Sequence, residues 1–381
     1  MSYFKLNKAK IFFCIVFLSA AFSVFAQHPQ NPGNESWKMF QKAQALFDQK
    51  NYGKSIKLAN DCLAQRKKEV EYIDYVLANA LKPYPVRKVG DDINEVLTVL
   101  RERDEYESVE IIETYINEKG EDYFDSSISK LTEYLHKRQD YPEVYFLIAK
   151  IYRLEGEFDM AYTYLEKAHA SSFLLEIPAQ DIDILYEMAA IAENKNDVPR
   201  QEKLLELIAV NDGRYSDTNL KNALLRTSRS TKEDNSSRFF ELYRIDAIRT
   251  VNAYYSLSKI YDNAKEREKA YLANLYAVLI SFTHINSILE ERESDYHYKN
   301  LTEFFEEIKK YPDIVEWCGK NHFWEGFYNI YTLGIKNKCT RFPVDVVNVL
   351  AKSCPEIYWK NAAIEAASKI REEKQVTITV D

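Results

Sequence analysis

Residues 141–170 read YPEVYFLIAKIYRLEGEFDMAYTYLEKAHA and hold two apolar segments on either side of Gly156. Alanine recurs in both segments, at Ala149 in the first and at Ala161 and Ala168 in the second. Small residues let two helices cross closely, and the large apolar residues beside them fill the seam. This stretch therefore predicts a pair of packed helices.

The pattern of this pair resembles a tetratricopeptide repeat, in which large, small and aromatic residues follow a fixed order over about 34 residues. The positions in register are Tyr145, Ile148, Ala149, Tyr152, Gly156, Phe158, Ala161, Leu165 and Ala168. A second copy lies over 250–282, and weaker copies surround Ala43 and Ala189. The resemblance implies an all-α solenoid of helix-turn-helix units.

Degenerate copies are expected between these four. The small anchor residues stand at positions 43, 149, 189 and 258, and the long gaps leave room for units near 78, 114 and 223. Counting them gives about seven helix pairs between Glu35 and Ser287.

The chain divides into five segments on this interpretation. Residues 1–26 are a signal peptide, 27–34 a disordered start, and 35–290 the repeats, with a mobile loop at 227–237 (TSRSTKEDNSS). Residues 291–373 are further helices that close the solenoid, and 374–381 form a flexible tail.

The N-terminal segment carries three lysines, then an apolar run, then Val24-Phe25-Ala26 before Gln27. This order is typical of a cleaved secretory signal, although an uncleaved anchor shares it. Its ending is similar to exported proteins of the Bacteroidota. Loss of these lysines would raise the acidic excess from 8 to about 11, which disfavours nucleic-acid binding.

No catalytic, phosphate-binding or dinucleotide motif occurs in the sequence, so we expect neither enzymatic activity nor a cofactor. Beyond the signal, the four cysteines admit three interpretations: buried thiols, a disulfide among the last three, or a zinc site formed by the last three with His322. They are Cys62, Cys318, Cys339 and Cys354.

The resemblance also implies a concave groove lined by fixed positions of each first helix. Position 5 of that helix is aromatic in all four best copies, and cationic or amide residues occupy positions 9, 12 and 13 of several copies. The predicted partner-binding residues are Phe40, Phe146, Lys150, Arg153, Tyr186, Asn194, Tyr255, Lys259 and Asn263. Such rings either receive an extended peptide or pack against the next unit.

Together these patterns predict a non-enzymatic scaffold of the bacterial periplasm or cell envelope that binds a protein or peptide. Any association with the membrane would then be indirect. A glycan-capturing helper of an outer-membrane uptake system is a second hypothesis, because rings also stack on sugars. An enzyme on an α-helical scaffold is a third.

Overall fold

The computed structural model describes residues 29–82, 90–212, 214–232 and 235–378. The chain forms two compact units, of which unit 1 ends at Glu176 and unit 2 begins at Ile177. The described residues form helices with no strand among them, apart from one isolated bridge between Asp92 and Ser127. The predicted all-α fold of tetratricopeptide-like helix pairs is confirmed.

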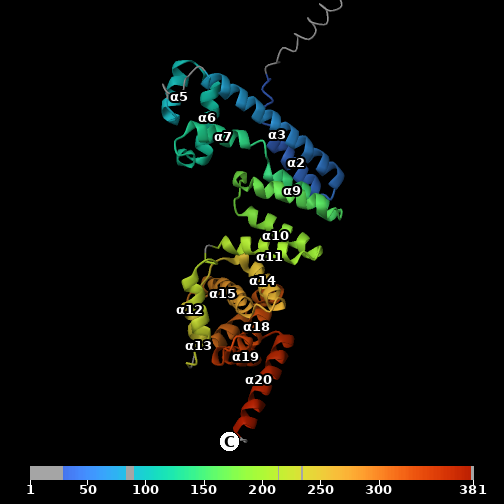
Figure 1. Cartoon of the computed structure of the whole chain (residues 1–381), viewed down its shortest axis with the longest axis vertical. Coiled ribbons are helices and arrows are strands. Elements are labelled where there is room, and N and C mark those ends of the chain that lie inside the picture. The colour runs from blue at the N-terminus through green and yellow to red at the C-terminus, as the bar shows by residue number, and fades with distance from the viewer. Residues whose placement is uncertain (1–28, 83–89, 213, 233–234, 379–381) are drawn as a thin grey trace, which may run out of the picture. The chain divides into compact units, whose positions relative to one another are not determined.

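Unit 1 consists of helix pairs and one further helix, α7 (Figure 1). Helix α2 packs on α3, α5 on α6, and α8 on α9, while α3 also contacts α6, α7 and α8. The bounds are α2 Ser36–Asp48, α3 Tyr52–Leu81, α5 Ile93–Glu102, α6 Tyr106–Lys119, α7 Ile128–Lys137, α8 Pro142–Leu154 and α9 Phe158–Ala170. With 30 residues, α3 is long enough to serve several neighbours at once.

Unit 2 begins with two further pairs, α10 with α11 and α14 with α15, and ends in further helices that pack on α15 or on one another. The bounds are α10 Gln180–Asn194, α11 Val198–Val210, α12 Thr218–Ser228, α13 Asn235–Leu242, α14 Val251–Asn263, α15 Arg267–Arg292, α16 Leu301–Ile308, α17 Pro312–Lys320, α18 Phe323–Lys336, α19 Arg341–Ser353 and α20 Ile357–Ile378.

The same three-residue turn joins the helices of five pairs. Its middle residue has a positive φ, from 55° at Asn196 to 81° at Gly156. The next residue donates its N–H to the carbonyl five positions earlier, as from Glu157 to Tyr152 at 2.9 Å. This is a Schellman end, which satisfies carbonyls that the helix leaves open. The five middle residues are Lys50, Asp104, Gly156, Asn196 and Lys265.

Small residues stand where the two helices of a pair cross. Ala149 and Ala161 are 2% and 0% exposed, as the repeat pattern requires. In two other pairs a serine tightens the crossing, because Ser55 Oγ donates to the Ala43 carbonyl at 2.8 Å. Ser258 Oγ does the same to the Ala270 carbonyl at 2.9 Å.

Helix α15 is the core helix of unit 2. Among the described helices it alone has the length and apolar character of a membrane span, yet 78% of that apolar stretch is buried inside the protein. Its side chains pack against α14 and α18. We therefore assign its apolar character to core packing.

The structure corrects several predicted boundaries. Position 78 lies inside the continuous helix α3 and position 114 lies in the second helix of its pair, so neither begins a separate unit. The loop predicted at 227–237 is shorter, because α12 continues to Ser228 and α13 begins at Asn235. The predicted tail from 374 is helical as far as Ile378.

The start of the chain also differs from expectation. Residues 29–34, predicted to be disordered together with 27 and 28, lie against α3, where Gln65 Nε2 donates to the Pro32 carbonyl at 3.1 Å. The signal peptide predicted at 1–26 lies outside the described residues.

Close packing against α18 provides a test of the fold. A Cβ atom at Gly326 would lie 2.7 Å from the Tyr255 ring and 2.8 Å from Val278. We expect Gly326→Ala to lower the free energy of unfolding by about 1–3 kcal/mol through overpacking.

The matched control is Gly319→Ala in α17, where a Cβ would meet nothing within 4 Å. This change should raise stability by up to about 1 kcal/mol through helix propensity. Urea denaturation of both variants measures the difference, and equal stability of the two would contradict the packing described here.

Candidate functional site

Two of the four predicted groove rings are buried between helices, and the other two, Phe40 and Tyr186, are half-buried. Phe146 and Tyr255 are only 3% and 4% exposed. Phe40 packs on Tyr141 with 5.5 Å between ring centroids. The Tyr186 hydroxyl donates to the Arg249 carbonyl at 2.9 Å and accepts the Ala253 N–H at 3.1 Å. This is the packing alternative that the sequence left open.

The burial of these rings also affects the glycan hypothesis. Stacking on a sugar needs an accessible aromatic face, and neither Phe146 nor Tyr255 presents one. The structure therefore gives that hypothesis no support at these positions.

The predicted polar groove residues remain at the surface. Arg153, Asn194, Lys259 and Asn263 are exposed and Lys150 is half-buried. Lys259 Nζ lies 3.2 Å from the Glu325 carboxylate, an exposed ion pair that contributes little to stability. Within unit 1, Lys150 Nζ lies 3.9 Å from the centroid of the Phe146 ring. Their role in binding stays a prediction.

Unit 1 contains a cavity of about 330 Å³, which we call the α3–α6 cavity. Its walls come from α3, α6, Arg138 and the segment before α2. The lining residues are Asn31, Pro32, Gly33, Asn34, Arg66, Glu69, Val70, Tyr72, Ile73, Glu107, Glu110, Ile111, Thr114, Tyr115 and Arg138. Its volume lies in the range of small-ligand sites.

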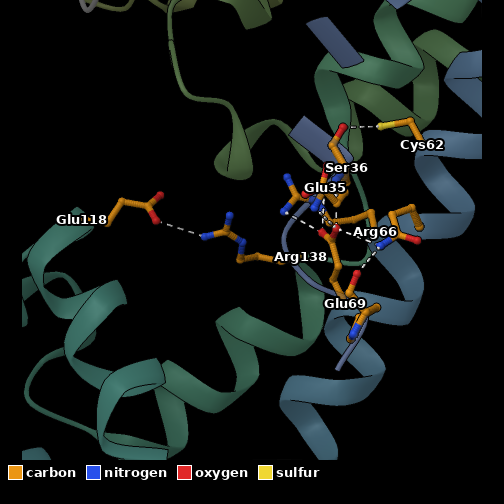
Figure 2. A network of polar contacts seen from close by, with 9 residues as sticks. Glu35, Ser36, Cys62, Arg66, Glu69, Glu118 and Arg138 are labelled. Atoms are coloured by element: carbon orange, nitrogen blue, oxygen red, sulfur yellow. Dashed lines mark hydrogen bonds and ion pairs between the residues drawn. The ribbon is translucent and has the colours of Figure 1, made fainter. Parts of the chain in front are cut away.

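Glu69 fixes the start of α2 beside this cavity (Figure 2). Its Oε1 accepts the backbone N–H groups of Glu35 at 2.8 Å and Ser36 at 2.9 Å. Its Oε2 accepts the Ser36 hydroxyl at 2.6 Å. These three donors belong to the start of α2, and Gln65 Nε2 donates to Oε1 as well at 3.4 Å. The Glu69 side chain is only 7% exposed and acts as a distant cap for α2.

Arg66 stands one helical turn from Glu69 on α3. Its guanidinium lies 4.2 Å from the Tyr141 ring centroid and 3.9 Å from the Glu69 carboxylate, which is too far for a hydrogen bond. Its Nε is buried and has no hydrogen-bond partner among the residues that the structure describes. Burial raises the pKa of Tyr141 to about 12, so the ring beneath Arg66 stays neutral.

Arg138 follows the end of α7 and lines the same cavity. Its guanidinium lies 4.5 Å from the Tyr115 ring centroid, and its NH1 donates to Glu118 at 3.3 Å. Figure 2 shows Arg138 directed toward Glu118 and Glu69 turned toward the start of α2. Two arginines stacked on tyrosines therefore flank one region of the cavity wall.

Carboxylates mark another part of the cavity. The Tyr72 hydroxyl donates to Glu107 at 2.5 Å, a bond that raises the pKa of Tyr72. Glu110 lies one helical turn further along α6 and is exposed.

The sequence did not reveal this cavity, because its lining residues come from distant stretches of the chain and share no motif. The one local signal is the helical spacing of Arg66, Glu69, Val70 and Ile73 on α3.

The four cysteines beyond the predicted signal are buried free thiols. Burial raises the pKa of Cys62 and of Cys354 to about 12, and it raises that of Cys318 and Cys339 as well. Over the described residues, no group of three or more His, Cys, Asp and Glu is arranged to hold a metal ion. The structure thus corresponds to the buried-thiol interpretation.

Comparison with known proteins places this geometry in context. Residues 142–168 match the tetratricopeptide repeat family, so the chain contains such a repeat. An uncharacterized protein of Treponema pallidum (strain Nichols) is 26% identical over 335 residues, covering 87% of this chain and 89% of that protein. An uncharacterized protein of Borreliella burgdorferi is 24% identical over 225 residues, covering 54% and 69%. Both relatives are from spirochaetes, so they do not support the expected likeness to Bacteroidota.

Buried Glu143, at the start of α8, gives a test by pH. Its Oε1 accepts the Glu176 N–H at 2.8 Å, and burial raises the pKa of its carboxyl above the ordinary 4.5. The folded state therefore keeps this proton to higher pH than the unfolded state. Stability from this group is present below about 4.5 and falls as the pH rises through the folded-state pKa.

We expect Glu143→Gln to remove this fall, so the variant should gain stability relative to the wild type between pH 4.5 and 7.5. Urea midpoints at the two pH values measure the gain. Glu155→Gln, at the exposed end of the same helix, controls for the lost charge. A parallel pH dependence of E143Q and the wild type would show that Glu143 is not the source.

Proposed function

We propose that this protein is an exported, non-enzymatic scaffold that binds an extended, partly acidic segment of a partner protein in the periplasm or cell envelope. Tetratricopeptide repeats generally mediate protein–protein interaction, and the match over residues 142–168 supports such a role in general. We infer that the partner segment is partly acidic from two cationic residues of this repeat, Lys150 and Arg153.

One observation carries the proposal: the cationic side of α8, the first helix of the matched repeat. Lys150 lies over the buried Phe146 ring, and Arg153 is exposed one turn further along. A ring beneath a lysine restricts that side chain, so less entropy is lost when it binds. In a chain with a net charge of −8, these two cationic side chains would attract an acidic partner.

Export is part of the proposal and rests on the sequence alone. The three lysines, the apolar run and Val24-Phe25-Ala26 have the order of a cleaved signal. Cleavage after Ala26 would leave residues 29–34 close to the new N-terminus, where they pack against α3 in the described structure.

A charge reversal tests the binding surface. We expect Lys150→Glu with Arg153→Glu to reduce capture of partner proteins from the native envelope at least tenfold, because an acidic segment would then be repelled. Capture by the wild type should also weaken with added salt. Quantitative mass spectrometry of the captured proteins provides the measurement.

The matched control reverses Lys54 and Lys57, which are exposed on α3, the second helix of the first pair. Circular dichroism establishes that both double variants remain helical. If K150E/R153E captures the same proteins as K54E/K57E at the same level, the α8 surface is not the binding site.

A further inference from the structure

The α3–α6 cavity has two arginines at one end, ion-paired with Glu69 and Glu118, and carboxylates at the other. Tyr72 bonds to Glu107, while Arg138 stacks on Tyr115, eight residues further along α6. At a rise of 1.5 Å per residue, these points are about 12 Å apart. Both arginines line the cavity, and so do two of the four α6 glutamates, Glu107 and Glu110. The cavity therefore has an arginine end and a carboxylate end.

The arginine end offers donors beyond the contacts described above. A guanidinium carries five N–H donors, and within the part of the chain that the structure describes Arg138 donates one of them, to Glu118 at 3.3 Å. Arg66 is held against Tyr141, and its Nε lacks a partner within the described structure. Glu69 does not supply the acceptors, because three donors at the start of α2 already occupy its oxygens. A carboxylate is one of the groups that a guanidinium fork binds with two parallel hydrogen bonds.

The carboxylate end favours a cationic group of the ligand. Glu107 and Glu110 are exposed carboxylates on one face of α6, and of the two Glu107 bonds to Tyr72. They can accept an ammonium group. Between the two ends the wall is apolar, with Val70, Ile73 and Ile111. A ligand that fits both ends carries opposite charges separated by an uncharged middle.

We propose that the α3–α6 cavity binds a short free peptide of about three residues, with its C-terminal carboxylate at Arg66 and Arg138 and its N-terminal ammonium at Glu107 and Glu110. An extended chain spans about 3.3–3.6 Å per residue, so three residues bridge about 10 Å. A cavity of about 330 Å³ is large enough for a ligand of this class. The site is independent of the α8 surface and does not depend on partner capture.

Titration calorimetry with trialanine tests the proposal on the full chain. We expect trialanine to bind, and both trialanine amide and N-acetyl-trialanine to bind at least tenfold more weakly, because each lacks one terminal charge. Equal binding of the blocked and free peptides would overturn the proposal, as would no binding of trialanine at 10 mM, a concentration on the order of a weak site's Kd.

Variants assign the two ends. Arg138→Gln should weaken the binding of trialanine at least tenfold but leave the binding of trialanine amide unchanged. Glu107→Gln with Glu110→Gln should weaken the binding of trialanine at least tenfold but leave the binding of N-acetyl-trialanine unchanged. Arg101→Gln, on α5 outside the cavity, is the matched control. Glu107 and Glu110 are exposed, so E107Q/E110Q should remain folded and test the proposal even if Arg138→Gln unfolds the protein. Unchanged trialanine affinity in E107Q/E110Q would overturn the proposed orientation.

Discussion

The reversal between the helices of each pair depends on one residue held in the left-handed region of backbone space. At Lys50, Asp104, Asn196 and Lys265 that residue carries a side chain, which costs about 1–2 kcal/mol relative to glycine. The hydrogen bond that closes the turn and the packing of the two helices offset this cost. The turn fixes the direction in which the second helix returns, and small residues then set how closely it approaches.

This pairing determines where functional groups lie. Helix α3 extends well past its pairing with α2 and also reaches α6 and α7. The face of α3 that carries Arg66 and Glu69 therefore contacts two different elements. Glu69 caps the start of α2, and Arg66 lines a cavity that α6 also lines. The first helix of the matched repeat contributes Lys150 and Arg153 at its surface instead. Unit 1 thus carries a partly open cavity between α3 and α6, and the side chains of Lys150 and Arg153 on a different helix.

The sequence was most informative where the repeat pattern is complete. The pattern over 141–170 corresponds to α8 and α9, which run from Pro142 to Leu154 and from Phe158 to Ala170. The α5–α6 pair was not found, because α5 contains no alanine, glycine or serine that could serve as the small anchor residue. Its turn residue Asp104 is no less distinctive than Lys50, Asn196 or Lys265, which stand in pairs that the pattern did reveal.

The candidate site was less predictable for a related reason. Repeat register gives the position of a ring in its helix but not what covers it, and Tyr255 is covered by α18 at Gly326. The α3–α6 cavity joins Arg66, Glu107 and Arg138, which only the tertiary fold brings together. Residue types alone did not predict the α3–α6 cavity, although they did predict Lys150 and Arg153 on α8 and the buried small residues of the pairs.

The most direct test of the role of the turns is a reciprocal exchange at their left-handed residue. Gly156 has open space around its Cβ position, so Gly156→Ala adds backbone strain without a steric clash. It should lower the free energy of unfolding by about 1 kcal/mol, and Lys265→Gly should raise it by removing the same strain. Urea denaturation of the two variants measures both changes. Opposite signs are predicted, and a change of the same sign in both, or no change in either, would contradict the account.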